Sequence, residues 1–423
     1  MIYKKLKDCC TIIAGQSPES KYYNTEGVGL PFFQGKADFG ELYPTPRVYC
    51  SQPLRIAEKN DILLSVRAPV GPTNLAPCQS CIGRGLTAIR PLEFLDLKYL
   101  LYYFRYCEVQ LQQKGTGTTV KAITQDTIKN ISIPIPSVLE QERIVEQIEE
   151  LLSQLTNSTE TLKKAKQQLI LYRQSLLKKA FEGEFTRIWR QNESKDIAMH
   201  DFEKIRIRNT VTRSDGERNT VNLSLPKTWL QPRIGDVFRV EVGATPSRQK
   251  LEYWNGDIHW VSSGEVHFNT ITNTKECITE EGLTHSSTNI QPVGTVLLAM
   301  IGEGKTRGQA AILSTPAAHN QNTAAILVSK TPCHPKFLYY YLLLAYEHTR
   351  RIGSGNNQKA LNKERVRGLR FPFSSFAEQA LIVQEIETRM TICDNIEKDI
   401  ENILKQASVL QQSIMKKAFE GWF

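Results

Sequence analysis

The chain has 423 residues, of which 40% are hydrophobic and 23% charged, and its formal net charge is +9. This length suffices for two ordinary domains, and the composition is that of a globular protein rather than a disordered one. The longest apolar run, Phe337 to Tyr346, is too short for a membrane span and no signal peptide pattern is present, so we expect a cytoplasmic protein.

Residues 1–138 are predicted to form a first globular domain with many short strands and few helices, which indicates an α+β fold. The apolar segment Ile62–Val66 is expected to be a strand, and an aromatic amphipathic helix is expected near residues 96–112. Cys78 and Cys81 have the spacing of a zinc half-site. No second pair accompanies them, so two thiols in a strand or loop are the favoured interpretation.

Residues 139–183 are predicted to be one long helix with an apolar seam. The seam positions alternate spacings of four and three residues, which is the heptad pattern of a coiled coil. Pro136 and Ser137 precede the pattern and Gly183 follows it, as expected at the ends of a helix. The seam consists of Ile144, Ile148, Leu151, Leu155, Ser158, Leu162, Ala165, Leu169, Tyr172 and Leu176.

A connector of residues 184–222, without a clear pattern, leads to a second globular domain over residues 223–375. A strand is expected at Thr295–Ala299 and an aromatic helix near residues 335–350. A second long helix, residues 376–423, repeats the heptad. Its seam consists of Ile382, Ile386, Arg389, Cys393, Ile396, Ile400, Ile403, Ala407, Leu410 and Ile414, of which Arg389 fits poorly.

The second half of the chain repeats the first. Leu177–Phe185 matches Met415–Phe423 at an offset of 238 residues, and this register holds without gaps from about residue 98 to residue 185. Towards the N-terminus it drifts, since Pro18 best matches Pro246 at an offset of 228. Two similar scaffolds with dissimilar front parts suggest two readers of different targets, while drift after duplication is the alternative.

The two long helices can bury each other's seam as an antiparallel coiled coil, which would place the globular domains at opposite ends. The alternative is that the seams pack on the globular domains or on another subunit, because helix stability must come from packing somewhere.

The positive charge is confined to the globular domains. Residues 1–138 carry a formal charge of +5 and residues 221–375 carry +6, whereas residues 139–182 are neutral and residues 376–420 carry −3. This distribution predicts two domains that face nucleic acid, held on a neutral to acidic spacer.

Twelve polar side chains of these domains are candidates for DNA contacts. Arg and Lys commonly read guanine, Asn and Gln commonly read adenine, and many other contacts go to phosphate. The alternative for each is a solvated charge or a side chain that caps a loop. The candidates are Gln34, Lys36, Arg67, Arg84 and Lys121 in the first domain and Ser262, Ser263, Lys305, Arg307, Asn320, Gln321 and Lys359 in the second.

No segment has the pattern of a catalytic site. Gly302–Thr306 resembles the end of a phosphate-binding loop, but Ala299 stands where the full pattern requires glycine. A turn that presents Lys305 and Arg307 to DNA phosphates is the better interpretation. No cofactor loop and no histidine pair with metal-ligand spacing is present, so we expect no cofactor and no metal, although a site assembled only in three dimensions stays open.

Taken in order, these segments resemble the specificity subunit of type I restriction–modification enzymes over nearly the whole chain. Typical of that family are the start of the first helix, Ile133-Pro-Ile-Pro followed by Glu140-Gln-Glu-Arg-Ile-Val, and its end, Lys178-Lys-Ala-Phe-Glu-Gly. The opening of the second domain, Leu225-Pro-Lys-Thr-Trp and then Gly243-Ala-Thr-Pro-Ser, is similar to the family as well.

The resemblance implies a non-catalytic subunit whose two tandem target recognition domains each read one half of a bipartite site on double-stranded DNA. The long helices would form an antiparallel coiled coil that separates the domains, sets the half-site spacing and completes a pseudo-twofold repeat. Two modification subunits, which bind S-adenosylmethionine and methylate adenine, would dock on this chain. Restriction subunits, which cleave DNA with ATP and magnesium, would join them.

Two other functions fit parts of the sequence. A structural adaptor would use the coiled coil for assembly and the globular domains to bind protein. A stand-alone methyltransferase would transfer the methyl group by itself, but the Asp/Asn-Pro-Pro-aromatic motif of amino-methyltransferases is missing.

Overall fold

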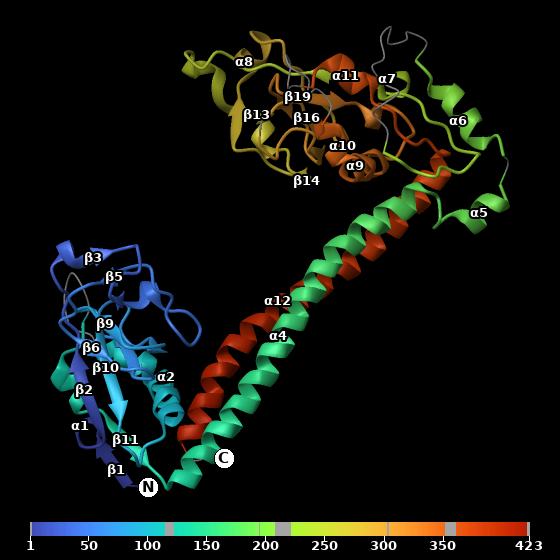
Figure 1. The fold of residues 1–423 in the computed structure, drawn as a ribbon. Coiled ribbons are helices and arrows are strands. Elements are labelled where there is room, and N and C mark those ends of the chain that lie inside the picture. Colours follow the sequence, from blue (N-terminus) through green and yellow to red (C-terminus); the bar gives the residue numbers. More distant parts are fainter. Residues whose placement is uncertain are drawn as a thin grey trace. The chain divides into compact units, whose positions relative to one another are not determined.

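The computed structural model describes residues 2–114, 122–193, 195–207, 221–302, 304–351 and 361–420 (Figure 1). The chain forms two compact units. Unit 1 comprises residues 1–164 and 399–423, and unit 2 comprises residues 165–398. The division falls inside both long helices, so each unit contains a part of each helix.

Unit 1 contains three sheets of short strands. A four-stranded sheet has the order β2-β10-β7-β8, a five-stranded sheet has the order β3-β5-β4-β9-β6, and β1 pairs with β11. The β4–β9 pairing is parallel, and the other pairings of these named strands are antiparallel. The strands are β1 Ile2–Lys5, β2 Cys10–Ala14, β3 Tyr23–Asn24, β4 Leu30–Phe33, β5 Tyr49–Cys50, β6 Ile56–Ala57, β7 Ile62–Ser65, β8 Thr73–Leu75, β9 Ser80–Ile82, β10 Leu86–Pro91 and β11 Ser132–Ile135.

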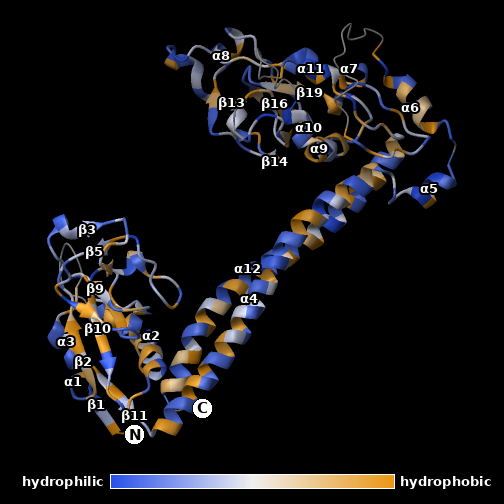
Figure 2. Cartoon of the chain, viewed as in Figure 1, coloured by the Kyte–Doolittle hydropathy of each residue, from blue (hydrophilic) through white to orange (hydrophobic). Residues whose placement is uncertain are grey.

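One long aromatic helix, α2, forms much of the core of unit 1. Its Tyr99 and Phe104 are buried together with strand residues such as Ile62 and Ile89, and Phe419 from the second long helix joins the same cluster. Figure 2 shows the resulting concentration of hydrophobic residues in β2, β10 and α2. The short helices and turns are α1 Leu6–Cys9, η1 Ser20–Tyr22, η2 Lys36–Asp38, α2 Leu97–Lys114 and α3 Gln125–Lys129.

Unit 2 contains a five-stranded sheet of order β12-β19-β16-β17-β14 and a three-stranded sheet of order β15-β13-β18. The β13–β18 and β14–β17 pairings are parallel. The predicted strands at Ile62–Val66 and Thr295–Ala299 are observed as β7 and β16. The strands of unit 2 are β12 Val240–Val242, β13 Trp254–Val261, β14 Asn269–Ile271, β15 Glu276–Ile278, β16 Val296–Ala299, β17 Ala310–Leu313, β18 Ala318–His319 and β19 Thr323–Ile326.

The described part of the connector, for which the sequence predicted no pattern, contains two short helices that pack in unit 2. The aromatic helix predicted near residues 335–350 is present, although Ala345 divides it into two. None of the helices in the described ranges combines the length and apolar character needed to span a bilayer. The helices are α5 Arg187–Gln191, α6 Ile197–Ile205, α7 Ile234–Val237, η4 Leu251–Tyr253, η5 Ser263–Glu265, α8 Glu280–Thr284, η6 Val328–Lys330, α9 Pro335–Leu344, α10 Tyr346–Arg351 and α11 Lys363–Gly368.

The two long helices are α4 Val138–Phe181 and α12 Phe376–Phe419, each 44 residues long. At 1.5 Å per residue each is roughly 66 Å in length. The end of α4 is a Schellman turn, in which Gly183 has a φ of 71° and donates to Ala180, while Glu184 donates to Lys179. Helix α4 begins and ends within two residues of its predicted bounds, whereas α12 begins at the predicted residue and ends at Phe419, before the predicted end at residue 423.

Within each unit, the segments of α4 and α12 pack side by side and run in opposite directions. In unit 2, Arg173 of α4 binds Asp394 at 2.8 Å and Glu397 at 2.9 Å, while residues nearer the end of α4 share a core with earlier residues of α12. The predicted seam is buried at the helix ends, as at Ile148, but Ile396 and Ile403 are 45% and 47% exposed.

The start of each long helix carries the same glutamine bridge. In unit 1, Gln141 donates to the carbonyl oxygens of Phe94 and Pro136 and accepts from the amide of Asp96, which begins the α2 segment. In unit 2, Gln379 donates to Ser374 and accepts from the amide of His334, the N-cap of α9. The glutamine of the repeated Glu-Gln pair thus ties each long helix to its aromatic helix.

Candidate nucleic-acid interface

Four of the candidate residues in unit 1 line one open pocket of about 750 Å³: Gln34, Lys36, Arg67 and Arg84. Gln34 directly follows β4, Arg84 lies two residues after β9, and Arg67 lies two residues after β7. The ends of these three strands meet, so residues far apart in the sequence come together. The sequence predicted this group of residues, but it did not show that they share a pocket.

A set of main-chain hydrogen bonds holds the strand ends in place. The amide of Gln16 donates to Ile82 at 3.0 Å, that of Gly83 donates to Phe33 at 2.8 Å, and that of Val66 donates to Gly85 at 2.9 Å. Gly15 makes this approach possible, because a Cβ there would lie 2.2 Å from the carbonyl oxygen of Gly83. These bonds fix the backbone positions from which the side chains of Gln34, Arg67 and Arg84 extend. We call them the frame.

The pocket of unit 1 has an excess of positive charge. Arg47 also lines it, but this guanidinium is bound to Asp38 at 2.5 Å, and the other oxygen of Asp38 accepts from the amide of Gln34 at 2.8 Å. Lys36, Arg67 and Arg84 are exposed, and none of their side chains has a partner among the described residues. Three cations and the exposed amide of Gln34 therefore face solvent from one concave surface.

Ser17 also belongs to this site, although it was not among the predicted residues. Its hydroxyl accepts from the amide of Arg84 at 3.3 Å, and it lines the same pocket. The repeat contained the signal for it. Ser17 precedes Pro18 as Thr245 precedes Pro246, so the two hydroxyl residues lie in the shifted register that aligns the front parts of the domains.

Unit 2 reproduces the frame bond for bond. The amide of Ala244 donates to His319 at 3.0 Å, that of Asn320 donates to Val261 at 3.0 Å, and that of Met300 donates to Asn322 at 2.8 Å. The correspondence places four pairs of side chains at matching positions, each with a different chemistry in the two units. The pairs are Ser17 and Thr245, Gln34 and Ser262, Arg67 and Ile301, and Arg84 and Gln321.

The side chains on the second frame are more neutral and more tightly bonded. Ser262 forms a capping box with Glu265, to which its hydroxyl donates at 2.8 Å. Asn320 is buried, and its carbonyl oxygen accepts from the amide of Asn322, so this amide group shapes the turn. Gln321 is exposed and accepts from the Thr245 hydroxyl at 2.5 Å, which leaves its NH₂ group facing outward. Ser263, the first residue of η5, is partly exposed beside Ser262.

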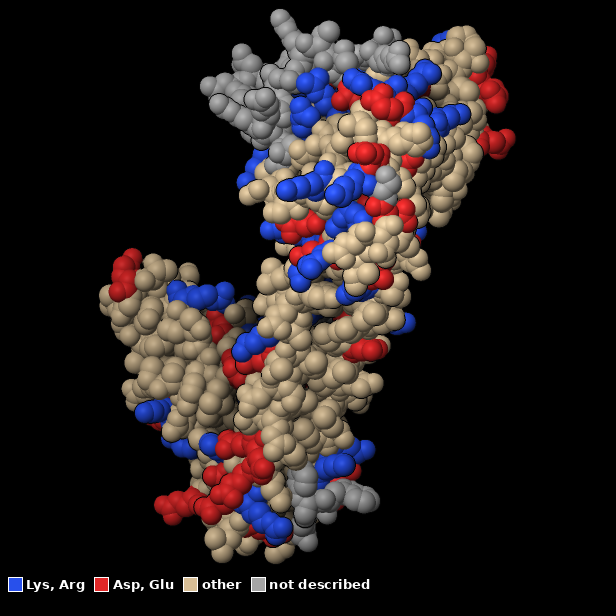
Figure 3. Space-filling view, turned by 90° about the vertical axis from the view of Figure 1, so that its right-hand side faces the viewer, with Lys and Arg blue, Asp and Glu red and all other residues tan. Residues whose placement is uncertain are grey.

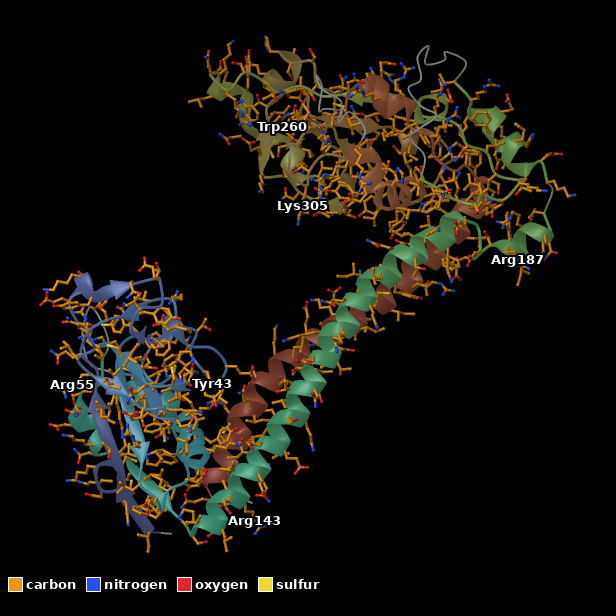
Figure 4. All side chains as sticks on the ribbon, in the orientation of Figure 1. Tyr43, Arg55, Arg143, Arg187, Trp260 and Lys305 are labelled. Atoms are coloured by element: carbon orange, nitrogen blue, oxygen red, sulfur yellow. The ribbon has the colours of Figure 1, made fainter. Side chains whose placement is uncertain are left out.

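Lys305 and Arg307 lie on the turn between β16 and β17, as predicted (Figure 4). The matching loop closes after six residues in unit 1, from Ser65 to Gly71, and after nine in unit 2, from Ala299 to Gly308. The longer loop carries the exposed Lys305. Arg307 is partly buried, and its Nε has no partner among the described residues.

Two further candidates, Lys121 and Lys359, lie outside the described residues. On the face of unit 2 seen in the upper part of Figure 3, Lys and Arg side chains are interspersed with Asp and Glu rather than gathered in one basic field. On this face of unit 2 the positive charge is thus interspersed with negative charge, whereas the pocket of unit 1 is lined by three cations without a described partner.

His319, the counterpart of Ile82 in the frame, lies in β18 and is fully buried. Its Nδ1 lies 2.8 Å from the hydroxyl of Thr323, and its Nε2 has no partner among the described residues. Burial lowers the pKa of His319 to about 4. The ring is therefore neutral at physiological pH and does not supply positive charge to the surface.

No group of three or more His, Cys, Asp or Glu side chains in the described ranges is arranged to hold a metal ion. Cys81 is buried in β9 and Cys78 is exposed in the preceding loop, and both are free thiols. The two cysteines of the CxxC spacing thus lie one in a strand and one in a loop.

Comparison with known proteins shows that the chain matches one family and resembles several relatives. The type I restriction modification DNA specificity domain matches residues 2–172 and 226–406. The protein named as the specificity subunit of the type I restriction enzyme MjaX in Methanocaldococcus jannaschii is 43% identical over 163 residues. That match covers 38% of this chain and 38% of the relative, so the chain spans well under half of that protein's length.

Two further similarities extend over more of the chain. The specificity subunit of the Escherichia coli type I restriction enzyme EcoDI is 25% identical over 340 residues, which cover 79% of this chain and 71% of that protein. A solved structure from work on complex assembly and conformational transition of the type I restriction–modification system covers 99% of this chain and 97% of its own, with 17% identity and a TM-score of 0.68. The latter similarity indicates a shared fold.

Proposed function

Because the chain belongs to the family of type I restriction modification DNA specificity domains, with two tandem copies, we propose that it reads a bipartite site on double-stranded DNA, one half-site per domain. The observation that carries this proposal is the duplicated frame. The same main-chain bonds present Arg67 and Arg84 in unit 1 but Ile301 and Gln321 in unit 2. Identical scaffolds with different side chains suit two different base sequences.

The chemistry of the two sites supports different readings. Arginine matches the two acceptors of guanine in the major groove, and glutamine matches the donor and acceptor of adenine. In unit 1 we propose that Gln34, Lys36, Arg67 and Arg84 contact DNA from the pocket. In unit 2 we propose the same for Ser262, Ser263, Lys305, Arg307, Asn320 and Gln321, with Lys121 and Lys359 as phosphate contacts on the two domains.

The long helices are proposed to set the spacing between the half-sites. The opposed packing of α4 and α12 in each unit supports an antiparallel coiled coil that separates the two recognition domains. Deletion of one heptad from each seam, within residues 144–176 and 382–414, should change the length of the spacer but leave both half-sites intact.

We further propose that the chain acts without catalysis of its own, in the cytoplasm and away from membranes. Two modification subunits and additional restriction subunits would dock on it, and S-adenosylmethionine, ATP and magnesium would bind to those partners. A stand-alone methyltransferase predicts methyl transfer by the purified chain, and we expect none.

The test uses the chain assembled with its modification subunits and a randomised DNA library, with methylome sequencing of the host as the independent readout. We expect one bipartite motif and binding that weakens steeply with salt, because phosphate contacts release counterions. Arg84→Gln should change the preferred base at one position of one half-site, at a cost of about 1–3 kcal/mol on the original site. Gln321→Arg should do the same for the other half-site.

The matched control is Arg55→Gln, which removes an exposed arginine of unit 1 outside the pocket (Figure 4). It should leave the motif unchanged. A complex that assembles but shows no sequence preference would contradict the proposal and would favour the structural adaptor.

A further inference from the structure

In unit 2, the connector binds the start of α12 through one buried carboxylate, that of Glu378. Glu378 is 2% exposed. It accepts from the hydroxyl of Thr186 at 2.7 Å, from the guanidinium of Arg190 at 2.5 Å and from the indole nitrogen of Trp229 at 2.8 Å. The Arg190 guanidinium also lies 5.7 Å from the centre of the Trp229 ring. Each oxygen of the carboxylate is therefore bonded.

Helix α6 of the connector covers the surface beside this carboxylate. Asp201 accepts from the amide of Phe376 at 3.0 Å and so caps α12. The ring of Phe202 packs on Phe373, which is fully buried, with 5.8 Å between centroids. The connector thus supplies the hydroxyl of Thr186, the guanidinium of Arg190 four residues later and the apolar side of α6. Figure 4 labels Arg187 where this segment begins.

The corresponding surface of unit 1 has no such cover among the described residues. The bridge of Leu230 with Phe373 corresponds to the pairing of Ile2 with Ile135 in β1 and β11. Ile2 is 71% exposed, and Val138, the counterpart of Phe376, is 46% exposed. We call the surface formed by Ile2, Ile135, Val138 and Glu140 the acceptor face.

The carboxylate of Glu140, the counterpart of Glu378, is exposed and binds no described side chain. The counterpart of Trp229 is Met1, which lies outside the described residues. Leu139, the neighbour of Glu140 in the sequence, is 79% exposed. Exposed apolar side chains near an unpaired carboxylate are a feature of surfaces that bind a partner. Here the repeat also shows what kind of segment fits.

We propose that the acceptor face docks an arginine-bearing amphipathic helix of a partner protein, in the way that unit 2 docks its own connector. The arginine pairs with Glu140, and the apolar side of the helix covers Ile2, Ile135 and Val138. Unit 2 fills its own surface in cis, so this helix binds once per chain. The inference concerns the surface of unit 1 and goes beyond the reading of DNA.

The probe is a labelled peptide with the sequence of residues 184–207, titrated into the full chain and followed by fluorescence anisotropy. We expect saturation at one peptide per chain. Glu140→Lys should weaken binding at least about tenfold, since it places like charges together. A peptide with Arg190→Glu should lose affinity for the unaltered chain and regain it for the Glu140→Lys chain, a reversal that a general loss of folding does not produce.

The matched control is Glu142→Lys, an equally exposed glutamate two residues further along α4, which should leave binding unchanged. Absence of saturable binding, or equal effects of the two lysine variants, would overturn the proposal. Sedimentation of the chain alone tests for a second copy as the occupant. Self-association that Glu140→Lys abolishes would overturn the assignment to a partner.

A last arm uses the complex with modification subunits and rests on the proposed function. The peptide should bind the free chain but not the complex, because a partner helix then fills the acceptor face. Binding to both would overturn the inference. Failure of the complex to form would count against the proposed function alone, since the lysine variants still test the face on the free chain.

Discussion

Unit 1 and unit 2 are built on the same main-chain frame, yet their surfaces are chemically different. Three amide-to-carbonyl bonds recur at matching positions, while Arg84 is replaced by Gln321 and Ile82 by His319. Main-chain hydrogen bonds do not depend on side-chain identity, so a frame built from them tolerates changes at the strand ends. A repeat can therefore keep its geometry and change what it contacts.

The starts of the two long helices show the opposite case, where the side chain is the same and the surroundings differ. Glu378 is buried beneath the connector, whereas Glu140 is exposed. Breaking the bonds of a buried carboxylate is costly because its partners are left unpaired, whereas the same residue in solvent contributes little to the free energy of unfolding. Matched substitutions of Glu140 and Glu378 measure directly how much each carboxylate contributes to the free energy of unfolding.

The largest difference is expected for Glu378→Ala against Glu140→Ala. Loss of Glu378 leaves the guanidinium of Arg190 unpaired in a half-buried position, which should cost about 3–5 kcal/mol. Glu140→Ala should stay within about 0.5 kcal/mol of the unaltered chain. Urea denaturation followed by tryptophan fluorescence measures the loss in unit 2, because Trp189, Trp229, Trp254 and Trp260 all belong to that unit.

The fifth tryptophan, Trp422, is assigned to unit 1, so these measurements belong in a Trp422→Phe background. Hydrogen exchange of the amides of α2 provides the corresponding readout for unit 1. Equal destabilisation by the two alanine substitutions would show that the connector contacts add nothing to unit 2.

A smaller and equal effect in both units is expected for Gln141→Ala and Gln379→Ala. Each glutamine joins a carbonyl oxygen before its long helix to the amide at the start of the aromatic helix, and its removal leaves buried groups without partners. We expect a loss of about 1–3 kcal/mol from each. Gln→Glu at the same positions, which keeps the acceptor but removes the donor, separates the two bonds. A large difference between the units would mean that the bridges are not equivalent.

The smallest effect is an acid sensitivity confined to unit 2. The pKa of His319 is lowered to about 4 in the folded chain, so between that value and the unfolded pKa near 6.5 only the unfolded state binds the proton. Stability is therefore lost as the pH falls through this window, by about 1 kcal/mol at pH 5.5 relative to pH 7.5.

Urea midpoints of unit 2 at several pH values measure this loss, and His319→Gln should flatten the profile whatever its effect on stability at neutral pH. The unaltered Ile82 gives unit 1 no corresponding contribution. A profile that stays the same in the His319→Gln chain would assign the acid sensitivity to other groups.

The features of the fold that were predicted from the sequence are those with long periodic signals. The heptad seam predicted both long helices. For the first of them, Pro136 and Gly183 agreed with the start and end that the seam indicated. The connector helices could not be predicted in this way. α5 and α6 contain five and nine residues, too few for a clear period, and they are held by contacts with Glu378 and Phe376 that lie far away in sequence.

The sequence predicted which residues belong to the candidate site but not how they are arranged in space. Gln34, Lys36, Arg67 and Arg84 were identified by their chemistry, and the crossing strands bring them into one pocket. The local use of Asn320 in a turn was not predictable, since the same amide suits a base edge and a main-chain nitrogen equally well. Whether each residue touches DNA stays a prediction that the substitutions of Arg84 and Gln321 address.

The division of the chain inside its long helices has a consequence for biosynthesis. Met415, Ala418 and Phe419 belong to the core that contains Tyr99 and Phe104, whereas all residues of unit 2 precede position 399. A ribosome therefore delivers the complete sequence of unit 2 before it delivers the last pieces of unit 1. The domain that is translated first is therefore the one whose sequence is completed last. Until then, its aromatic helix α2 lacks the contact with the ring of Phe419.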